Sequence, residues 1–164
     1  MRLGEESRLY KAVYADYQHD PLPSRSSSGR FHRADTGGVT SYLAASPQTA
    51  WREVRQRWRA DPDAYRMVQV RVKVSKIVDL TDPATQTRYG VDREVLTGER
   101  YEQCQRLAAR LRAEAVEAAW TFSRADSPQG RCLVLFLDLL AAESHVKAEQ
   151  FAPLPADEAW TEEI

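Results

Sequence analysis

Three side chains that could bind or cleave a charged ligand lie within one short stretch, GRFHRADTGGVTSYLAASPQTAWREV, residues 29–54. Arg30 offers a guanidinium fork, which binds a phosphate or a carboxylate through two parallel hydrogen bonds. Phe31 beside it could offer an aromatic face. Tyr42 and Glu53 follow after a glycine turn, and they add a second aromatic ring and a carboxylate.

The elements that position these side chains can be predicted from local signals. A turn at Gly37-Gly38 leads into a short strand at 40–45. Ser46 and Pro47 then predict a helix to about Arg59, with serine as the N-cap and proline at the first helical position. Four residues form the apolar face of this helix: Ala50, Trp51, Val54 and Trp58. Glu53 lies on the flank of that face, so the pattern forces it neither into the core nor fully outward.

Each of these residues also has an ordinary structural interpretation. Glu53 could pair at the surface with Arg57, four residues on, in the favourable order of acid before base. Arg30 could be a solvated loop charge. Tyr42 could be a half-buried strand aromatic. No single residue of the stretch therefore establishes a site.

Elsewhere the chain intersperses strand and helix signals. The clearest strand is RMVQVRVKV (66–74), whose four valines at alternate positions share one face, which we expect to face the core. A long helix is predicted from about Gly98 to Trp120, because apolar residues recur with the helical period. The remaining predicted elements are strands at 9–14, 76–82, 131–140 and 145–151, the last an edge strand, with a loop at 18–30, an irregular segment at 82–90 and a turn at 121–130.

The fold class predicted from this order is α+β, because strict βαβ alternation is absent. The length of 164 residues favours one domain, 1–164, with a core at about 9–151 and a loosely held C-terminal tail at 152–164. Trp160 could hold that tail in place.

Composition excludes several classes of protein. A formal net charge of −1 and a pI near 6.3 lack the basic excess of a generic nucleic-acid binder. No apolar run is long enough to span a membrane, and the N-terminus lacks the apolar core of a signal peptide, so we expect a cytoplasmic protein. Cys104 and Cys132 match no metal or redox spacing and are expected to be free thiols. The three histidines form no zinc pattern, so no metal is expected.

The combination GRFxx…G…YLAxSPxTAxxEV is more specific than any of its members, and it resembles the RES domain family. The matching positions are Gly29-Arg30-Phe31, Gly38, Tyr42-Leu43-Ala44, Ser46, Ala50 and Glu53-Val54. A serine before a glycine and an apolar strand completes the pattern in TFSRADSPQGRCLVLF, where we choose Ser123 over its rival Ser127. The resemblance extends from about Leu9 to Phe136.

The resemblance implies a fold like that of ADP-ribosyltransferases, with a split β-sheet core and flanking helices. It also implies the toxin of a bacterial toxin–antitoxin pair. Such toxins destroy NAD by phosphorolysis or hydrolysis, or they transfer ADP-ribose to a protein. The implied partner is a Xre-like antitoxin whose C-terminal part covers the active site, in a complex compatible with a homodimer of the toxin.

The residues suit NAD as the substrate. Breaking the nicotinamide–ribose bond builds positive charge on the ribose, which the carboxylate of Glu53 can stabilise. Tyr42 could form an aromatic wall for nicotinamide, and Ser123 could bind the ribose or a phosphate. The pyrophosphate needs cationic donors such as Arg30 and Lys11. No metal is required, because nicotinamide is already a good leaving group.

Two departures from the family pattern leave alternatives open. Lys11 stands where many relatives carry an arginine, and lysine lacks the bidentate fork. His32 stands where many relatives carry an asparagine, so it is either a contact for a substrate ribose or a solvated loop histidine. The acceptor therefore stays open among phosphate, water and protein. A protein mono-ADP-ribosyltransferase and a catalytically silent protein-binding domain remain the alternative functions.

Overall fold

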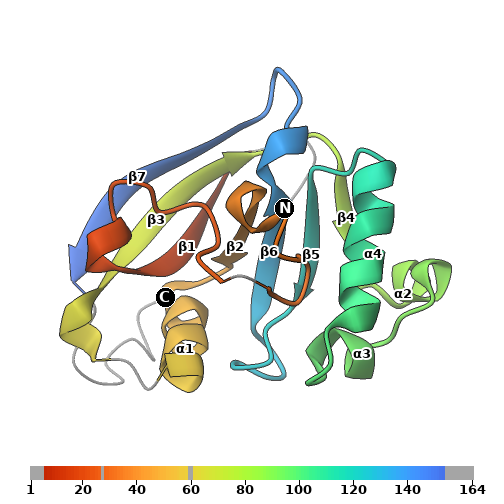
Figure 1. Cartoon of the computed structure of the whole chain (residues 1–164), viewed down its shortest axis with the longest axis horizontal. Coiled ribbons are helices and arrows are strands. Elements are labelled where there is room, and N and C mark those ends of the chain that lie inside the picture. The colour runs from red at the N-terminus through yellow and green to blue at the C-terminus, as the bar shows by residue number, and fades with distance from the viewer. Residues whose placement is uncertain (1–5, 27, 59–60, 154–164) are drawn as a thin grey trace.

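Seven strands form one mixed sheet in the computed structural model, which describes residues 6–26, 28–58 and 61–153 (Figure 1). In chain order they are β1 (Ser7–Tyr14), β2 (Thr40–Ala44), β3 (Tyr65–Lys73), β4 (Ile77–Asp79), β5 (Ala118–Phe122), β6 (Arg131–Phe136) and β7 (His145–Pro153). Their order across the sheet is β4-β5-β6-β2-β1-β3-β7. The β4–β5 pair is parallel and all other neighbours are antiparallel.

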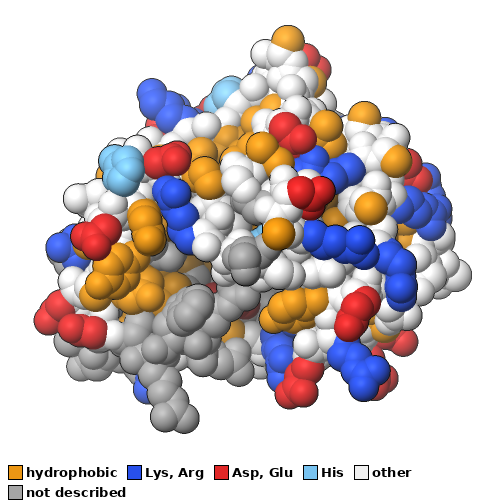
Figure 2. Space-filling model, viewed as in Figure 1, with side chains coloured by type: hydrophobic (Ala, Val, Ile, Leu, Met, Phe, Trp, Pro, Cys, Tyr) orange, Lys and Arg blue, Asp and Glu red, His pale blue; other side chains and the backbone are white. Residues whose placement is uncertain are grey.

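Four α-helices of the described chain flank the sheet: α1 (Pro47–Trp58), α2 (Pro83–Tyr89), α3 (Arg93–Thr97) and α4 (Glu102–Ala113). With the seven strands they make a single α+β domain, as predicted from the order of the elements. No helix in the ranges that the structure describes is long and apolar enough to cross a membrane. Both acidic and basic side chains lie on the face shown in Figure 2, and the formal net charge of the chain is −1.

The sheet is divided into two halves that meet at a narrow junction. β1 pairs with β3 along its whole length, but its register with β2 contains a single pair, Tyr10 with Ala44. Buried side chains from both halves pack together on one sheet face, and they include Leu9, Leu43, Val68 and Leu133. The two halves therefore share one core, which gives the split sheet expected from the sequence.

The helices lie against the opposite face of the sheet. α1 packs over β1, β2 and β3, where Ala50 and Trp51 contact Ala44 and Met67. α2, α3 and α4 pack over β5 and β6 in a second cluster, which also contains the ring of Phe31. Both sets of helices cover the sheet face that carries Tyr42, and α1 stands apart from α4 in Figure 1.

The structure confirms two of the local predictions. Val68, Val70 and Val72 of β3 and the following Val74 are buried, at 1% exposure or less, as their alternation predicted. The α1 N-terminus is capped as expected, because Ser46 Oγ accepts the backbone N–H of Thr49 at 3.1 Å. The expected edge strand is β7. Most of the expected C-terminal tail, including Trp160, lies outside the described residues.

The predicted long helix at 98–120 was wrong, because it covers a helix and a strand. α4 ends at Ala113, and Ala115 adopts a left-handed φ of 57°. The N–H of Val116 then bonds to the carbonyl of Leu111 at 3.0 Å, which closes the helix. Glycine usually occupies such a left-handed position. Because Ala115 occupies it here, the sequence carried no glycine signal for the end of the helix. Residues 118–122 instead pair with both β4 and β6.

Two further predicted segments differ from the structure. Residues 82–90, expected to be irregular, contain α2, which has Asp82 as its N-cap and a left-handed Gly90 at its C-cap. The strand predicted at 131–140 ends at Phe136 and continues as a short 3-10 turn at Leu137–Leu139. Apolar residues continue through this turn because Leu137 packs against the core formed by both halves of the sheet.

Candidate active site

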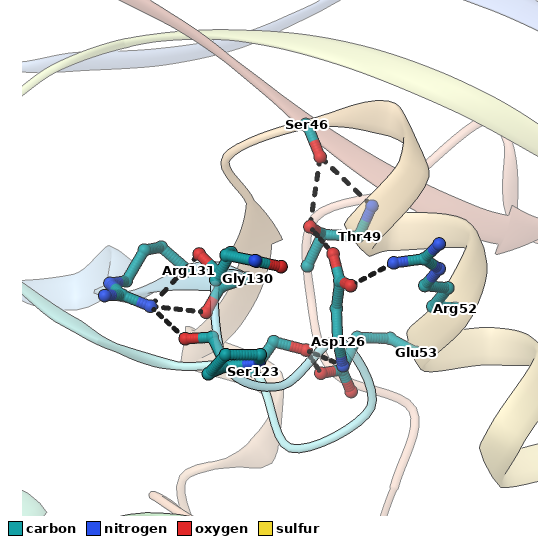
Figure 3. Close-up of polar contacts among 10 residues, drawn as sticks. Ser46, Thr49, Arg52, Glu53, Ser123, Asp126, Gly130 and Arg131 are labelled. Atoms are coloured by element: carbon teal, nitrogen blue, oxygen red, sulfur yellow. Dashed lines mark hydrogen bonds and ion pairs between the residues drawn. The ribbon is translucent and has the colours of Figure 1, made fainter. Parts of the chain in front are cut away.

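Glu53 and Ser123 form the centre of the candidate site (Figure 3). Glu53 projects from α1, and Ser123 directly follows β5. The hydroxyl of Ser123 donates a hydrogen bond to Glu53 Oε1 and accepts one from the backbone N–H of Asp126 at 3.1 Å. Ser123 is 1% exposed, and its own N–H is bonded to the carbonyl of Gly130 at 2.9 Å. The serine is therefore held by three hydrogen bonds, one of them to the carboxylate.

Ser127, the rival serine, occupies a different environment. It is exposed on the loop between β5 and β6, and it precedes Pro128. The structure thus places Ser123 rather than Ser127 beside Glu53.

Cys132 of β6 lies beside the pair formed by Glu53 and Ser123. Its Sγ is 4.0 Å from Glu53 Oε1. Burial, together with the adjacent Glu53 carboxylate, raises the pKa of the Cys132 thiol well above its usual value. The thiol is therefore protonated at neutral pH, which makes it a poor nucleophile. Burial also raises the pKa of Cys104, and both cysteines are free, as predicted.

A second group of contacts is built around the hydroxyl of Tyr42. It accepts the backbone N–H of Phe31 at 2.9 Å and lies 2.7 Å from His32 Nδ1. The other ring nitrogen, His32 Nε2, lies 3.0 Å from the carbonyl of Ser26, which can only accept. A neutral His32 therefore carries its proton on Nε2, and its Nδ1 accepts the hydroxyl proton of Tyr42. This network directs the tyrosine hydroxyl toward the histidine.

Arg30 lies in the loop beside this network. Its guanidinium donates to the carbonyl of Gly98 at 2.7 Å and stacks 4.7 Å from the centre of the Tyr101 ring. The side-chain amide of Gln105 on α4 holds the same loop through the carbonyls of Gly29 and His32, at 2.9 and 3.2 Å. Arg30 is thus a half-buried, anchored side chain, and the interpretation as a solvated loop charge was wrong.

The two groups lie on the same face of the sheet. Cys132 of β6 is directly opposite Ala44 of β2, so their side chains share a face. Tyr42 is two residues before Ala44, and alternate residues of a strand point to the same side, about 7 Å apart. Cys132 in turn contacts Glu53. Tyr42 and the bonded pair of Glu53 and Ser123 therefore lie on one face of the sheet, and the loop of Arg30 is bonded to Tyr42.

Lys11 is not brought to this group. It alternates with Tyr10, which pairs with Ala44, so its side chain points to the opposite face of the sheet. Its ammonium donates to the carbonyls of Leu22 and Pro23 at 2.8 and 3.3 Å. Burial, followed by the charge of Arg25, lowers the pKa of Lys11 to about 7. In this structure Lys11 holds the loop after β1, and it faces away from Glu53.

Two other expectations need correction in their geometry. The ring of Phe31 is 1% exposed within the core, so it offers no open aromatic face to a ligand. His32 is 2% exposed, so the interpretation as a solvated loop histidine was wrong. Tyr42 is half-buried in β2, in agreement with its ordinary interpretation as well as with a site role. The side chain of Arg57 lies outside the described residues, so its expected pair with Glu53 stays a prediction.

A polar network that was not predicted from the sequence joins the Ser123 loop to α1. Asp126, 8% exposed, accepts hydrogen bonds from Thr49 and Arg52 on the helix that carries Glu53 (Figure 3). The one local signal is the spacing of Ser123 and Asp126, in which a serine hydroxyl accepts the N–H three residues on. The described residues contain no group of three or more His, Cys, Asp or Glu side chains that could hold a metal ion.

Comparison with known proteins identifies the class to which this fold and site belong. The family model of the RES domain matches residues 7–157, which is most of the chain. The chain therefore belongs to the RES domain family. No curated protein matches it.

Solved structures confirm the fold. Seven chains match, among them one from the crystal structure of the M. tuberculosis MbcT–MbcA toxin–antitoxin complex. The superposition has a TM-score of 0.75 at 19% sequence identity, and it covers 93% of this chain and 86% of that chain. At this identity the likeness extends to the fold alone.

Proposed function

We propose that this chain is the toxin of a bacterial toxin–antitoxin pair and that it consumes NAD by cleaving the nicotinamide–ribose bond. The observation that carries the proposal is the hydrogen-bonded pair of Glu53 and Ser123, which lies on the same sheet face as Tyr42. Membership of the RES domain family supports it. So does the fold shared with a chain of a toxin–antitoxin complex.

The reaction needs a negative charge beside the ribose. As nicotinamide leaves with the electrons of the glycosidic bond, positive charge develops on the ribose carbon. The carboxylate of Glu53 stabilises that charge, and phosphate or water then forms the new bond to the same carbon; with water as the acceptor, a proton is released to solvent. Ser123 holds one oxygen of the carboxylate in place through its hydrogen bond.

Tyr42 and Arg30 serve binding in this proposal. Tyr42 presents a half-buried ring whose hydroxyl is already directed to His32, so the ring has a defined orientation as a wall for nicotinamide. Arg30 provides the cation for the pyrophosphate, because its guanidinium retains N–H groups beyond the one that donates to Gly98. Phe31 and His32 do not contact the substrate in this proposal, and they hold the hydroxyl of Tyr42 through hydrogen bonds. Lys11 holds the loop after β1 through the carbonyl of Leu22.

The partner in this proposal is a cognate Xre-like antitoxin that covers the site. A toxin that drains the cytoplasmic NAD pool must be held inactive, and a peptide with a carboxylate can occupy the position of the pyrophosphate near Arg30. The chain itself binds neither nucleic acid nor membrane in this scheme, and it can form a homodimer within the complex. Deleting the C-terminal tail of the antitoxin should restore NAD cleavage while the two proteins remain associated. Full inhibition by the tailless antitoxin would exclude a block at the site.

The direct test is product analysis with purified protein. NAD is incubated with the protein, with and without phosphate, and nicotinamide, ADP-ribose and ADP-ribose phosphate are quantified. ADP-ribose alone indicates water as the acceptor, the phosphorylated product indicates phosphate, and labelled protein indicates ADP-ribosyl transfer. The absence of NAD loss in every condition would overturn the proposal and favour a silent binding domain.

The residue assignment is tested by Glu53→Gln, which keeps the shape of the side chain and removes its charge. NAD turnover should fall by about 10²–10³-fold, the scale for losing one stabiliser of transition-state charge. Glu102→Gln, an exposed glutamate in the first turn of α4, is the matched control and should keep normal turnover. Near-normal turnover in Glu53→Gln would remove Glu53 from the mechanism.

A further inference from the structure

Asp126 is a buried carboxylate that takes no part in the reaction described above. It lies in the loop that joins β5 to β6 and is 8% exposed. Its Oδ2 accepts the hydroxyl of Thr49 at 2.6 Å, and its Oδ1 accepts the guanidinium of Arg52 (Figure 3). Both partners belong to α1, so Asp126 ties the loop of Ser123 to the helix of Glu53.

The N-cap residue of α1 orients the Thr49 hydroxyl toward Asp126. Ser46, the N-cap residue, donates its hydroxyl proton to Thr49 Oγ1 at 3.0 Å. Thr49 therefore accepts from Ser46, and its one hydroxyl proton is directed to Asp126. On the other side of the carboxylate, Arg52 directly precedes Glu53 in the chain. The anchor thus acts on the turn of α1 that carries the proposed catalytic carboxylate.

The same residue also fixes the orientation of Ser123. The backbone N–H of Asp126 points at Ser123 Oγ, 3.1 Å away. Because that lone pair is occupied by a donor, the hydroxyl proton of Ser123 is directed to Glu53. The loop leaves little slack, because a Cβ on Gly130 would lie 2.6 Å from Asp126 Cβ and 3.0 Å from Ser123 Cβ.

We propose that Asp126 is a positioning residue, which holds the hydroxyl of Ser123 on Glu53 by clamping its loop to Thr49 and Arg52. The inference rests on the proposed NAD-cleaving function. Both carboxylate oxygens are occupied by α1 and the side chain is buried, so Asp126 acts through Ser123 and does not touch the substrate. Removing the clamp frees the loop, and the serine proton is then no longer confined to the glutamate.

The test is a double-mutant cycle on NAD cleavage with Ser123→Ala, Asp126→Ala and the double variant. Asp126→Ala should lower kcat by about 10- to 100-fold with KM for NAD little changed, the scale of a hydrogen bond to a charged group. In the Ser123→Ala background the same substitution should have little further effect, because there is no hydroxyl left to position. Equal losses in both backgrounds would overturn the proposal.

Conservative variants separate positioning from a general loss of folding. Thr49→Val removes the donor to Asp126 and should reproduce the fall in kcat, whereas Thr49→Ser keeps the hydroxyl and should retain activity. Asp126→Asn replaces Asp126→Ala if the alanine variant fails to fold. Asp138→Ala, which removes an exposed ion pair with Arg112, is the matched control and should leave kcat unchanged. Equal activity in Thr49→Val and Thr49→Ser would contradict the clamp.

A second readout does not depend on activity. Amide hydrogen exchange of Asp126 and Gly130, measured by NMR, should be faster in Thr49→Val than in the parent protein, because the loop is released from α1. If the parent protein consumes no NAD, the proposed function fails, while this exchange still reports whether the clamp exists. Unchanged exchange in Thr49→Val would overturn the clamp whatever the activity.

Discussion

Gly29→Ala should destabilise the protein because a methyl group at this position has no room. A Cβ built on Gly29 would lie 2.4 Å from His32 Cε1, 2.7 Å from His32 Nδ1 and 3.0 Å from the hydroxyl of Tyr42. Ordinary contacts of a Cβ begin at 3.4 Å, so the imidazole must move by 3.4 − 2.4 = 1.0 Å. The ring is buried and bonded at both ends, to Tyr42 at 2.7 Å and to the carbonyl of Ser26 at 3.0 Å. A shift of that size breaks at least one of these bonds.

The magnitude follows from two terms. Overpacking a filled site costs about 1–3 kcal/mol, and leaving one buried polar partner unsatisfied costs about 1–3 kcal/mol more. The free energy of unfolding should therefore fall by roughly 2–5 kcal/mol, a large share of the 5–15 kcal/mol typical of a domain. The midpoint of thermal unfolding should drop by about 5–15 °C.

The assay is urea and thermal unfolding followed by circular dichroism, with Gly38→Ala as the matched control. Gly38 also belongs to the family motif, but a Cβ there meets nothing within 4 Å, so its unfolding free energy should stay within about 0.5 kcal/mol of the parent. Histidine ¹⁵N shifts supply a second readout, because the parent His32 should be the Nε2–H tautomer. Equal stability of the two alanine variants would refute the packing argument at Gly29.

Three further predictions concern charged groups. Arg30→Ala should weaken NAD binding in calorimetry and Arg30→Lys should recover part of it, whereas unfolding of the alanine variant would make Arg30 structural. The carboxylate of Glu117 accepts four hydrogen bonds, two at each oxygen, from the N–H groups of Ser75, Lys76 and Ala141 and from the hydroxyl of Ser144. In Glu117→Gln an amide nitrogen replaces one oxygen and cannot accept its two bonds. The free energy of unfolding in urea at pH 7 should therefore fall by about 3–6 kcal/mol. Burial alone would raise the pKa of Glu117, but the hydrogen bonds outweigh burial and the pKa is lowered. The carboxylate therefore stabilises the fold above pH 4.5. The difference in unfolding free energy between the parent and Glu117→Gln should shrink as the pH falls through the lowered pKa. The pKa of Lys11 is lowered to about 7 in the folded state, so between pH 7 and 10.5 the unfolded state binds more protons than the folded state. The free energy of unfolding should therefore rise from pH 7 toward pH 10.5 in the parent protein, and it should rise less in Lys11→Met. Equal slopes in the two proteins would contradict this prediction.

The sequence predicted those elements whose signals are local. Alternating valines identified β3, and serine followed by proline identified the start of α1. The predictions were wrong where a local signal was absent or was short. Ala115 takes the left-handed position at the end of α4 without a glycine to mark it. The Asp82-Pro83 start and Gly90 end of α2 were present, but the segment is only seven residues long and has no clear apolar period.

The site followed the same division. Arg30, Tyr42, Glu53 and Ser123 were all chosen from the sequence, because their order matched the RES domain pattern. Their orientation was not predictable, because it depends on contacts between distant parts of the chain. Lys11 illustrates this, since its place in the motif suggested a phosphate ligand while the alternation of β1 turns it to the other face of the sheet.

The sequence by itself therefore determined the class of fold, the family and the residues with the right chemistry, because periodicity, caps and motif order are written within a few residues. Tertiary structure alone decided which of those residues meet. The bond between Ser123 and Glu53 joins positions 70 residues apart, and the clamp between Asp126 and Thr49 joins positions 77 apart. Such contacts exist only after the sheet has assembled and buried their partners, because in the unfolded chain water satisfies the same polar groups.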